Sequence, residues 1–367
     1  MISGIKILPN GVDIEKFNRI NKEEALNYVK NRFKTNLNAE LKLIFVGRIA
    51  KEKGLVYLID ALKLLDDVEL LVIGGGPEEA NMKEHSAGLG LGEKIHFLGA
   101  VENDKIPVVL NAADIFVLPS VSEGFSNSLL EAMACDLPSI VTDVGAGKEI
   151  VTDKVGKVVN RGSAEQIAEA VKEIRADYGK YRPREIVKER YSFEKVAEVA
   201  YNVYSDVCER ELENVCFASF RAPPYSLAGL GIQTFGLARE LAKRCDVTIL
   251  TSNVTKAPAQ EKIGNVNLCR VKHVNILTGR PFYSLAATLR GLRLPKFDVV
   301  DGRNWEGGLA AVLMKKVKGN RAVVSFRGEG AFEGPWIKGI VNKYVINNVD
   351  LITATDRQTF NEVKKLI

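Results

Sequence analysis

The chain has 367 residues, of which 46% are apolar and 26% charged, and its formal net charge is +5. This length allows two domains of ordinary size, and the composition is that of a globular protein. No run of 18 apolar residues predicts a membrane span, no signal peptide precedes the first predicted strand, and five scattered cysteines without a CxxC pair favour a reduced cytoplasmic protein.

Short apolar runs that end near glycine alternate with helical periodicity along the first half of the chain. Strands are predicted at 41–46, 68–73, 94–98, 115–118 and 139–141, and helices at 55–65, 106–112 and 129–134. This alternation is typical of a parallel sheet covered by helices. Ligands of such sheets bind at the carboxyl ends of the strands, which is where the glycines lie.

A long helical stretch at 192–212 closes the first half, and a second α/β series follows it. Strands are predicted there at 214–220, 247–250, 297–300, 322–325 and 351–353, with a helix at 232–243. We therefore predict two α/β domains, at 1–191 and 213–367, with 192–212 as a helix and linker between them.

The two halves differ in charge. Residues 213–367 contain 23 Lys and Arg against 12 Asp and Glu, whereas residues 1–212 contain 28 against 34. The basic half indicates an anionic partner, such as a phosphorylated acceptor, a lipid head group or a membrane surface. An excess of surface lysine on an ordinary domain explains the same numbers, so both interpretations stay open.

Two glycine-bearing loops follow predicted strands in the first half. Gly47-Arg-Ile-Ala-Lys-Glu-Lys-Gly54 contains Arg48 and Lys53, which can bracket a pyrophosphate, and glycine permits close approach to the backbone. The second loop is Gly74-Gly-Gly-Pro77. Each loop alone is weak support for a site, because Arg and Lys are usually solvated and a glycine loop is often only a turn.

Two glutamates with seven residues between them, Glu123 and Glu131, flank the predicted start of a helix. A helix N-terminus supplies free N–H groups and partial positive charge, which favour an anion. Taken alone, a capping box, Ser128-x-x-Glu131, is the preferred explanation of Glu131. A further glycine-bearing loop, Thr142-Asp-Val-Gly-Ala-Gly-Lys-Glu-Ile150, follows the next strand.

In this order and spacing, the four features resemble the donor-binding domain of glycosyltransferase family 4. The resemblance runs from Pro9-Asn-Gly-Val-Asp13 to Phe193-Glu-Lys and covers most of residues 1–210. The second half resembles the acceptor domain of the family more loosely, through a first strand, a loop with Gly229 and Gly231, and the helix that follows. The resemblance implies the GT-B fold, in which two Rossmann-like α/β/α domains face a cleft.

The resemblance also implies roles for individual residues. Arg48 and Lys53 match the pair that binds the donor diphosphate. Glu123 matches the residue that holds the donor sugar, and Glu131 the residue that binds the ribose. Further donor contacts are implied for Gly47, Gly74, Val101, Asn103, Gly124, Phe125, Ser126, Asn127, Ser128, Gly229 and Gly231.

The implied reaction is transfer of a sugar from a UDP-, GDP- or ADP-sugar to an acceptor, with retention at the anomeric carbon, no cofactor and no nucleic-acid partner. Negative charge builds on the leaving diphosphate, and two cations beside a helix N-terminus stabilise it. No metal is then required, and no Asp-x-Asp motif is present to hold one.

One departure concerns a histidine that family members commonly carry near the sugar. Arg327, in Val324-Ser-Phe-Arg-Gly-Glu-Gly330, stands where this histidine is expected. We expect Arg327 to act in catalysis with Arg48, Lys53 and Glu123, by contacting an anionic group of the donor or the acceptor. The alternative is a plain surface or phosphate-binding arginine.

The domain order is reversed relative to the family, in which the acceptor domain comes first. Joining Ile367 to Ile2 restores the usual order, and Glu213-Asn-Val-Cys-Phe217 is similar to a former N-terminus. We interpret the chain as a circular permutant cut at the interdomain hinge, with an engineered origin favoured over a natural gene. Permutation is tolerated where termini lie close together at the surface.

Other interpretations stay open on the sequence alone. A sugar-nucleotide epimerase or a phosphorylase shares the GT-B fold, and a non-catalytic sugar-nucleotide-binding protein would keep the same residues. The segment Arg280–Pro295 mixes apolar and basic residues as interfacial helices do, which suggests peripheral contact at the inner membrane face. A helix packed on its own sheet is the favoured explanation of this segment.

Overall fold

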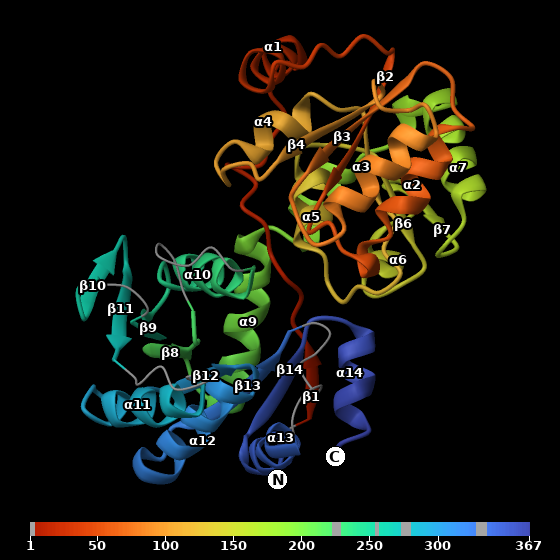
Figure 1. The fold of residues 1–367 in the computed structure, drawn as a ribbon. Coiled ribbons are helices and arrows are strands. Elements are labelled where there is room, and N and C mark those ends of the chain that lie inside the picture. Colours follow the sequence, from red (N-terminus) through yellow and green to blue (C-terminus); the bar gives the residue numbers. More distant parts are fainter. Residues whose placement is uncertain (1–3, 222–228, 254–256, 273–279, 328–335) are drawn as a thin grey trace. The chain divides into compact units, whose positions relative to one another are not determined.

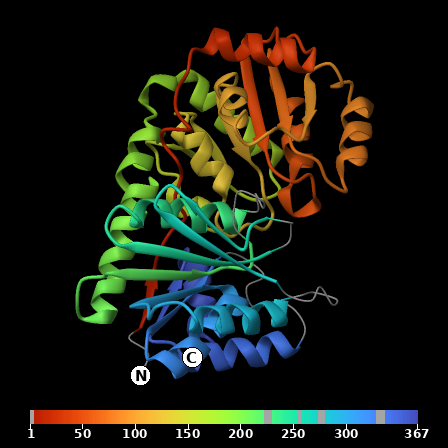
Figure 2. The same ribbon diagram turned by 90° about the vertical axis from the view of Figure 1, so that its left-hand side faces the viewer.

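A computed structural model describes residues 4–221, 229–253, 257–272, 280–327 and 336–367. The chain divides into two compact units (Figures 1 and 2). Val12–Ser192 forms one, which we call the six-stranded unit. Met1–Gly11 and Phe193–Ile367 form the other, which we call the eight-stranded unit. Both units are α/β, as predicted.

The six-stranded unit is built on a parallel sheet with the strand order β4-β3-β2-β5-β6-β7. The strands are β2 (Leu41–Val46), β3 (Val68–Ile73), β4 (Ile95–Gly99), β5 (Ile115–Leu118), β6 (Ser139–Thr142) and β7 (Gly156–Val159). β2, β3 and β5 are buried along their whole length, and they are apolar except for Lys42 in β2 and Glu69 in β3. The predicted strands are confirmed to within one residue at each end, and β7 was not predicted.

Helices cover both faces of this sheet (Figure 1). One core includes residues of α1 (Lys22–Phe33), α4 (Ile106–Asn111), α5 (Asn127–Ala134) and α8 (Pro183–Arg190). The other includes residues of α2 (Leu55–Leu62), α3 (Glu79–Gly88) and α7 (Ala164–Ala176). The short helices η1 (Lys51–Lys53), α6 (Gly147–Ile150) and η2 (Tyr178–Lys180) lie in the connections. Because the strands are parallel, their carboxyl ends meet at one edge of the sheet.

The eight-stranded unit has the strand order β1-β14-β13-β12-β8-β9-β11-β10, and only β10 runs antiparallel to its neighbour among the described strands. The strands are β1 (Ile5–Ile7), β8 (Asn214–Ala218), β9 (Asp246–Ser252), β10 (Gln260–Ile263), β11 (Val266–Val271), β12 (Val299–Arg303), β13 (Arg321–Phe326) and β14 (Leu351–Ala354). The strands predicted for this half are confirmed, with ends that shift by at most three residues. No range was predicted for β1, β10 or β11.

Helices pack on both faces of the larger sheet as well. α9 (Phe193–Cys208) and α10 (Gly229–Leu241) contribute to one core. α11 (Arg280–Leu292), α12 (Asn304–Lys318), α13 (Trp336–Asn348) and α14 (Arg357–Lys364) contribute to the other. The predicted crossing stretch at 192–212 is α9 and a short connection, and it packs within the eight-stranded unit against α10.

The first eleven residues correct the predicted domain boundary. β1 pairs in parallel with β14, in the register Ile5↔Ile352, and Leu8 N donates to Ala354 O (2.8 Å). Leu8 is only 1% exposed and lies in the core of the eight-stranded unit. The predicted donor domain of 1–191 is therefore too long at its start, because its first residues complete the other sheet.

No helix in the described ranges is both long and apolar enough to span a bilayer. α11 packs on its own unit through Tyr283 and Ala287, which are fully buried, while Phe282, Leu285 and Leu289 are exposed. The buried face agrees with the favoured explanation of this segment, a helix packed on its sheet. Peripheral membrane contact stays a prediction.

Candidate functional site

The loops after β2 and β3 pack against each other at the carboxyl edge of the six-stranded sheet. Gly47 N donates to Ile73 O (3.0 Å), and Ile49 N donates to Gly75 O (3.0 Å). Gly74 has φ +123°, and a Cβ on it would lie 1.9 Å from the carbonyl oxygen of Gly47, so the position requires glycine. The two glycine-bearing loops predicted from the sequence therefore form one packed layer.

An ion pair joins two of the predicted site residues. Lys53 Nζ lies 2.6 Å from Glu123 Oε2, and the two side chains are 22% and 14% exposed. Val121 N donates to the carbonyl oxygen of Glu52 (2.8 Å), which fixes the turn that carries Lys53 against the loop that carries Glu123. The pair holds both side chains in place, and each keeps further donors or acceptors for a ligand.

The loop after β6 supports the backbone beside Glu123, a role that the sequence did not reveal. Gly145 has φ +57°, and a Cβ on it would lie 2.1 Å from the carbonyl oxygen of Glu123. Ala146 N donates to the carbonyl oxygen of Gly124 (2.8 Å). The fourth glycine-bearing segment, 142–150, therefore holds the glutamate loop in position.

α5 starts directly after this loop, and Ser126 caps it. Leu129 N donates to Ser126 Oγ (3.3 Å), and Ser128 Oγ lies 3.0 Å from the same oxygen. The predicted capping box of Ser128 and Glu131 is wrong, because the cap lies two residues earlier and Glu131 falls in the second turn. Capping therefore does not explain the glutamate.

Glu131 is a partly buried carboxylate whose side chain forms no hydrogen bond to another described residue. Burial raises its pKa to about 7, and the nearby charge of Lys16 opposes that rise. Lys16 Nζ also donates to Asn103 Oδ1, and burial lowers the pKa of the lysine. Sequence reasoning missed Lys16, although it lies only three residues beyond the Pro-Asn-Gly-Val-Asp motif.

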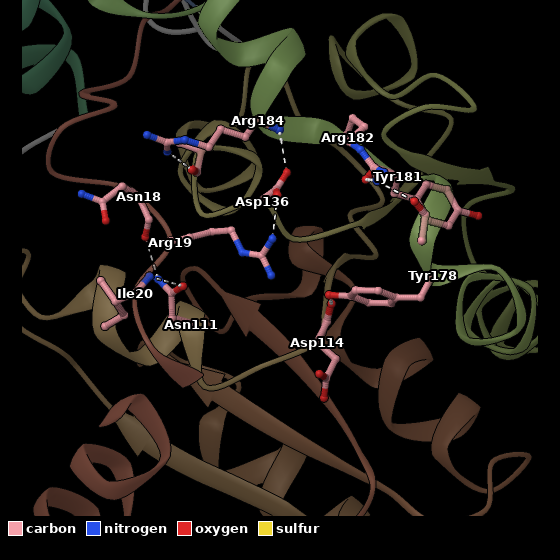
Figure 3. A network of polar contacts seen from close by, with 12 residues as sticks. Asn18, Arg19, Ile20, Asn111, Asp114, Asp136, Tyr178, Tyr181, Arg182 and Arg184 are labelled. Atoms are coloured by element: carbon pink, nitrogen blue, oxygen red, sulfur yellow. Dashed lines mark hydrogen bonds and ion pairs between the residues drawn. The ribbon is translucent and has the colours of Figure 1, made fainter. Parts of the chain in front are cut away.

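A polar network holds the segment that carries this lysine (Figure 3). Arg184 on α8 donates to the carbonyl oxygens of Ile14 (2.9 Å) and Phe17 (2.8 Å). Asn111 at the end of α4 accepts a hydrogen bond from Ile20 N (3.0 Å). Because the segment is fastened before and after the lysine, the fold itself sets the position of the backbone at Lys16.

The other predicted donor contacts lie along the same loops. The Arg48 side chain is 66% exposed, and its Nη1 lies 4.0 Å from Glu52 Oε1, so its guanidinium is open to a ligand. Phe125 packs edge-to-face on Tyr191, with ring centroids 6.3 Å apart. Val101 packs against the adjacent core.

In the eight-stranded unit, the predicted residues occupy two places. Gly229 and Gly231 lie in the first turn of α10, and the preceding loop, 222–228, is outside the described residues, as is 328–330 after Arg327. Arg327 follows β13, and its Nη1 donates to Asn10 Oδ1 (2.9 Å). Its Nε and Nη2 are buried, so the alternative of a plain surface arginine is wrong.

Titratable side chains do not gather into a metal site in the parts of the chain that the structure describes. The cysteines are free thiols. His85 Nε2 lies 2.7 Å from Asp60 Oδ1, and His96 Nε2 lies 3.5 Å from Glu69 Oε2. Both pairs lie within the six-stranded unit.

Comparison with known families matches two parts of the chain. Residues 28–192 match the family described as Glycosyl transferases group 1. Residues 228–364 match the family described as Glycosyl transferase 4-like domain. The first match covers most of the six-stranded unit, and the second covers most of the eight-stranded unit.

Curated proteins similar to this chain include an uncharacterised glycosyltransferase of Methanocaldococcus jannaschii, 32% identical over 215 residues, which cover 56% of this chain and 55% of that protein. The 2-deoxystreptamine glucosyltransferase of Streptomyces kanamyceticus is 33% identical over 182 residues (47% and 46%). The phosphatidyl-myo-inositol mannosyltransferase of Mycobacterium leprae is 35% identical over 136 residues (35% and 36%). The chain spans about half the length of the curated relatives it matches, or less.

Among solved structures, the HepE protein of Anabaena in complex with UDP is similar, with a TM-score of 0.50 and 22% identity over 55% of this chain and 57% of that chain. This likeness concerns the fold alone, and it agrees with the two parallel α/β units. The predicted resemblance and the predicted GT-B fold are both confirmed by these comparisons. The six-stranded unit therefore belongs to the family Glycosyl transferases group 1, and the eight-stranded unit is a Glycosyl transferase 4-like domain.

Proposed function

We propose that the protein is a retaining, metal-independent glycosyltransferase that moves a sugar from a nucleotide-diphospho-sugar to an acceptor. The observation that carries this proposal is the Lys53–Glu123 ion pair beside the start of α5. It combines a cation for phosphate, a carboxylate for sugar hydroxyls and a helix N-terminus on one edge of the sheet. The sugar-transferring relatives named above support transfer over epimerisation, phosphorolysis or binding alone.

Arg48 and Lys53 would bind the diphosphate of the donor. The bond from the anomeric carbon to the phosphate oxygen breaks, and negative charge grows on the leaving diphosphate. Cations already in position stabilise that charge more than they stabilise the ground state. The acceptor oxygen bonds to the anomeric carbon, and a phosphate oxygen of the leaving group takes the acceptor's proton.

Glu123 and Glu131 would bind the neutral parts of the donor. A carboxylate accepts two hydrogen bonds from neighbouring hydroxyls, which suits Glu123 to the sugar and Glu131 to the ribose. Glu131 accepts these bonds best when it is ionised, and Lys16 favours that form. Asn103, the hydrogen-bond partner of Lys16, would lie on the side of the base.

The order of the two domains is part of the proposal. The group 1 match at 28–192 precedes the 4-like match at 228–364, whereas the resemblance implies the opposite order for the family. This order supports a circularly permuted arrangement.

The first experiment is calorimetric titration with UDP, GDP and ADP. We expect one diphosphate to bind, and the double variant Arg48→Ala/Lys53→Ala to bind it at least about 100-fold more weakly, since each charge-assisted hydrogen bond contributes about 1.5–3 kcal/mol. Lys51→Ala, an exposed lysine of the same turn, is the matched control and should bind normally. Equal binding by the double variant would contradict the assignment of the cations.

Turnover is measured on the same samples with the nucleotide-sugars of the base that binds. Product formation that persists in excess EDTA supports the metal-independent reaction, and loss of product that Mg²⁺ or Mn²⁺ restores contradicts it. The anomeric configuration of the product, read by proton NMR, decides between retention and inversion.

A further inference from the structure

A tight corner joins β12 to α12 in the eight-stranded unit. A Cβ on Gly302 would lie 2.2 Å from the carbonyl carbon of Gly307, so strand and helix backbones are in direct contact. Asn304 opens the helix with φ 54°, and Arg303, the residue before it, provides no side-chain cap. The corner therefore presents a helix N-terminus without a side-chain cap at the carboxyl end of β12.

Arg303 at this corner is 1% exposed. Its guanidinium stacks over the ring of Phe217, 4.7 Å from the centroid. Its Nη2 lies 3.2 Å from Asp301 Oδ2, in a geometry that falls short of a hydrogen bond, and its Nε has no hydrogen-bond partner. The carboxylate of Asp301 is already occupied by the hydroxyls of Tyr204 (2.5 Å) and Ser325 (2.8 Å).

Arg327 reaches the same corner from the next strand, β13. Its backbone N donates to Asn304 Oδ1 (3.3 Å), and its Nη1 donates to Asn10 Oδ1. Its Nε and Nη2 are buried and donate no hydrogen bond. Trp305, the second residue of α12, also has a buried Nε1 without a hydrogen-bond partner.

Among the described residues, the charge of this cluster is not balanced. Two guanidinium groups face one described carboxylate, Asp301, and the nearby Tyr204 has a pKa raised by burial, so it is neutral. Burial and the charge of Arg303 lower the pKa of Arg327 to about 9, and Asp301 opposes that shift. Buried guanidinium groups with unused N–H donors are unfavourable unless an anion completes them.

We propose that Arg303 and Arg327 form a binding site for an oxyanion, a phosphate or carboxylate group carried by the acceptor. Guanidinium forks match the oxygen spacing of both groups, and the start of α12 adds backbone N–H donors. The site lies in the unit that matches the 4-like domain, which the family resemblance assigns to the acceptor. The acceptor of this protein is therefore an anionic molecule.

The assignment of this oxyanion to an acceptor rests on the function proposed above, so the first probe is inorganic phosphate, which needs no transfer. Thermal unfolding is followed by tryptophan fluorescence, because both tryptophans, Trp305 and Trp336, belong to the eight-stranded unit. Phosphate is compared with chloride at equal ionic strength. We expect phosphate to raise Tm in the wild type, and Arg327→Met to bind phosphate at least about tenfold more weakly.

Arg321→Met is the matched control, since Arg321 lies on the same strand but is 46% exposed and paired with Asp350. It should keep the phosphate effect. A wild type that phosphate does not stabilise, or an Arg327→Met variant that keeps the full effect, would overturn the proposal. Arg327→Lys keeps the positive charge but loses the paired N–H donors of the guanidinium group, so it should bind phosphate with intermediate affinity. This second variant serves as the test if the methionine variant does not fold.

A merely structural arginine is distinguished by pH and by stability. Phosphate affinity should fall as pH rises through about 9, where Arg327 loses its proton, although phosphate itself remains a dianion. In the absence of phosphate, Arg327→Met should be as stable as the wild type or more stable, because it removes an uncompensated buried charge. A large loss of stability together with unchanged phosphate binding would assign Arg327 to structure alone.

The source of the oxyanion is tested with glucose 1-phosphate, glucuronate and glucose. Arg327→Met should weaken binding of the two anionic sugars and leave the affinity for the donor diphosphate unchanged. If the variant instead weakens nucleotide binding and leaves the binding of the anionic sugars unchanged, the oxyanion belongs to the donor. The assignment to the acceptor is then overturned. Phosphate binding without any transfer would sustain the site and reject the proposed function.

Discussion

The carboxyl edges of the two sheets carry buried charges of opposite sign. In the six-stranded unit, Lys53 and Glu123 neutralise each other, and the remaining charge is a carboxylate, Glu131, which Lys16 compensates only in part. In the described part of the eight-stranded unit, the remaining charge is a guanidinium, because Asp301 faces both Arg303 and Arg327. The buried carboxylate of the six-stranded edge therefore favours ligand groups that donate hydrogen bonds, whereas the exposed Arg48 of the same edge stays open to an anion. The buried guanidinium groups of the eight-stranded edge favour anions.

Burial moves both charges toward neutrality, from opposite directions. The pKa of Glu131 rises from 4.5 to about 7, so its burial costs nothing below pH 4.5 and costs increasingly more as pH rises to about 7. The pKa of Arg327 falls from 12.5 to about 9, so its cost is fully present below pH 9 and disappears as pH rises toward 12.5. The two units are thus expected to respond to pH with opposite signs.

The largest effect is expected from Asp301→Asn, which removes the counter-charge of the eight-stranded edge. The aspartate is fully buried and accepts hydrogen bonds from Tyr204 and Ser325. Loss of one partner from a buried ion pair costs about 3–5 kcal/mol in unfolding free energy. Urea unfolding followed by tryptophan fluorescence measures the loss of unfolding free energy. The control Asp246→Asn changes an exposed position of β9, and its unfolding free energy should stay within about 0.5 kcal/mol of the wild type. Equal effects of the two variants would refute the charge imbalance.

Gly74→Ala tests the six-stranded edge through its backbone. The new Cβ would meet the Gly47 carbonyl at 1.9 Å in a conformation with φ +123°, so we expect a loss of about 3 kcal/mol and weak nucleotide binding. Gly90→Ala, at φ +70° with no atom within 4 Å, should cost about 1 kcal/mol. Hydrogen exchange of the β2 and β3 amides reports on this unit. Similar losses for both glycines would mean that backbone conformation alone, and not the loop contact, sets the cost.

Glu131→Gln should stabilise the six-stranded unit at pH 8 by about 2 kcal/mol and have little effect at pH 4.5, because only the ionised carboxylate is penalised by burial. The same variant should bind the donor diphosphate more weakly, since an amide accepts fewer hydrogen bonds from ribose. Stability is measured by hydrogen exchange at both pH values, with exposed Glu102→Gln as control. A stabilisation that does not change with pH would contradict the raised pKa.

Lys16→Met should have the smallest effect, confined to the pH dependence of nucleotide binding. Affinity in the wild type should fall as pH drops through about 7, because protonated Glu131 loses its charge and part of its acceptor capacity. Without the lysine, the midpoint of the pH dependence of nucleotide affinity moves to higher pH, which weakens binding at pH 7 by up to about tenfold. Lys16→Arg should restore the pH dependence of the wild type. Calorimetry at pH 6, 7 and 8 checks this; parallel profiles for wild type and Lys16→Met would exclude the coupling.

How well the fold could be predicted depended on how local each signal was. β2 and β3 are continuous buried runs that end in glycine, so the pattern of a few residues identified them. β1 is three residues long, Ile-Lys-Ile, and its register partner for Ile5 is Ile352 near the other end of the chain. No local pattern shows that this strand pairs with β14, and the domain boundary was misplaced for that reason.

The candidate site shows the same division. Lys53 and Glu123 could be named from their loops, but the contact between side chains 70 residues apart needed the fold. Lys16 could not be named, because a lysine in a polar turn has no feature of sequence that separates it from a solvated one; its partner Asn103 is 87 residues away. The binding roles of all these residues stay predictions.

The pairing of β1 with β14 decides how this protein can be dissected. A fragment of 12–192 keeps every described strand of its own sheet. A fragment of 193–367 loses β1 and turns β14, a fully buried strand, into an open sheet edge. Unprotected sheet edges of that kind pair with strands from other molecules. The fragment of 193–367 should therefore aggregate unless residues 1–11 are joined back to it.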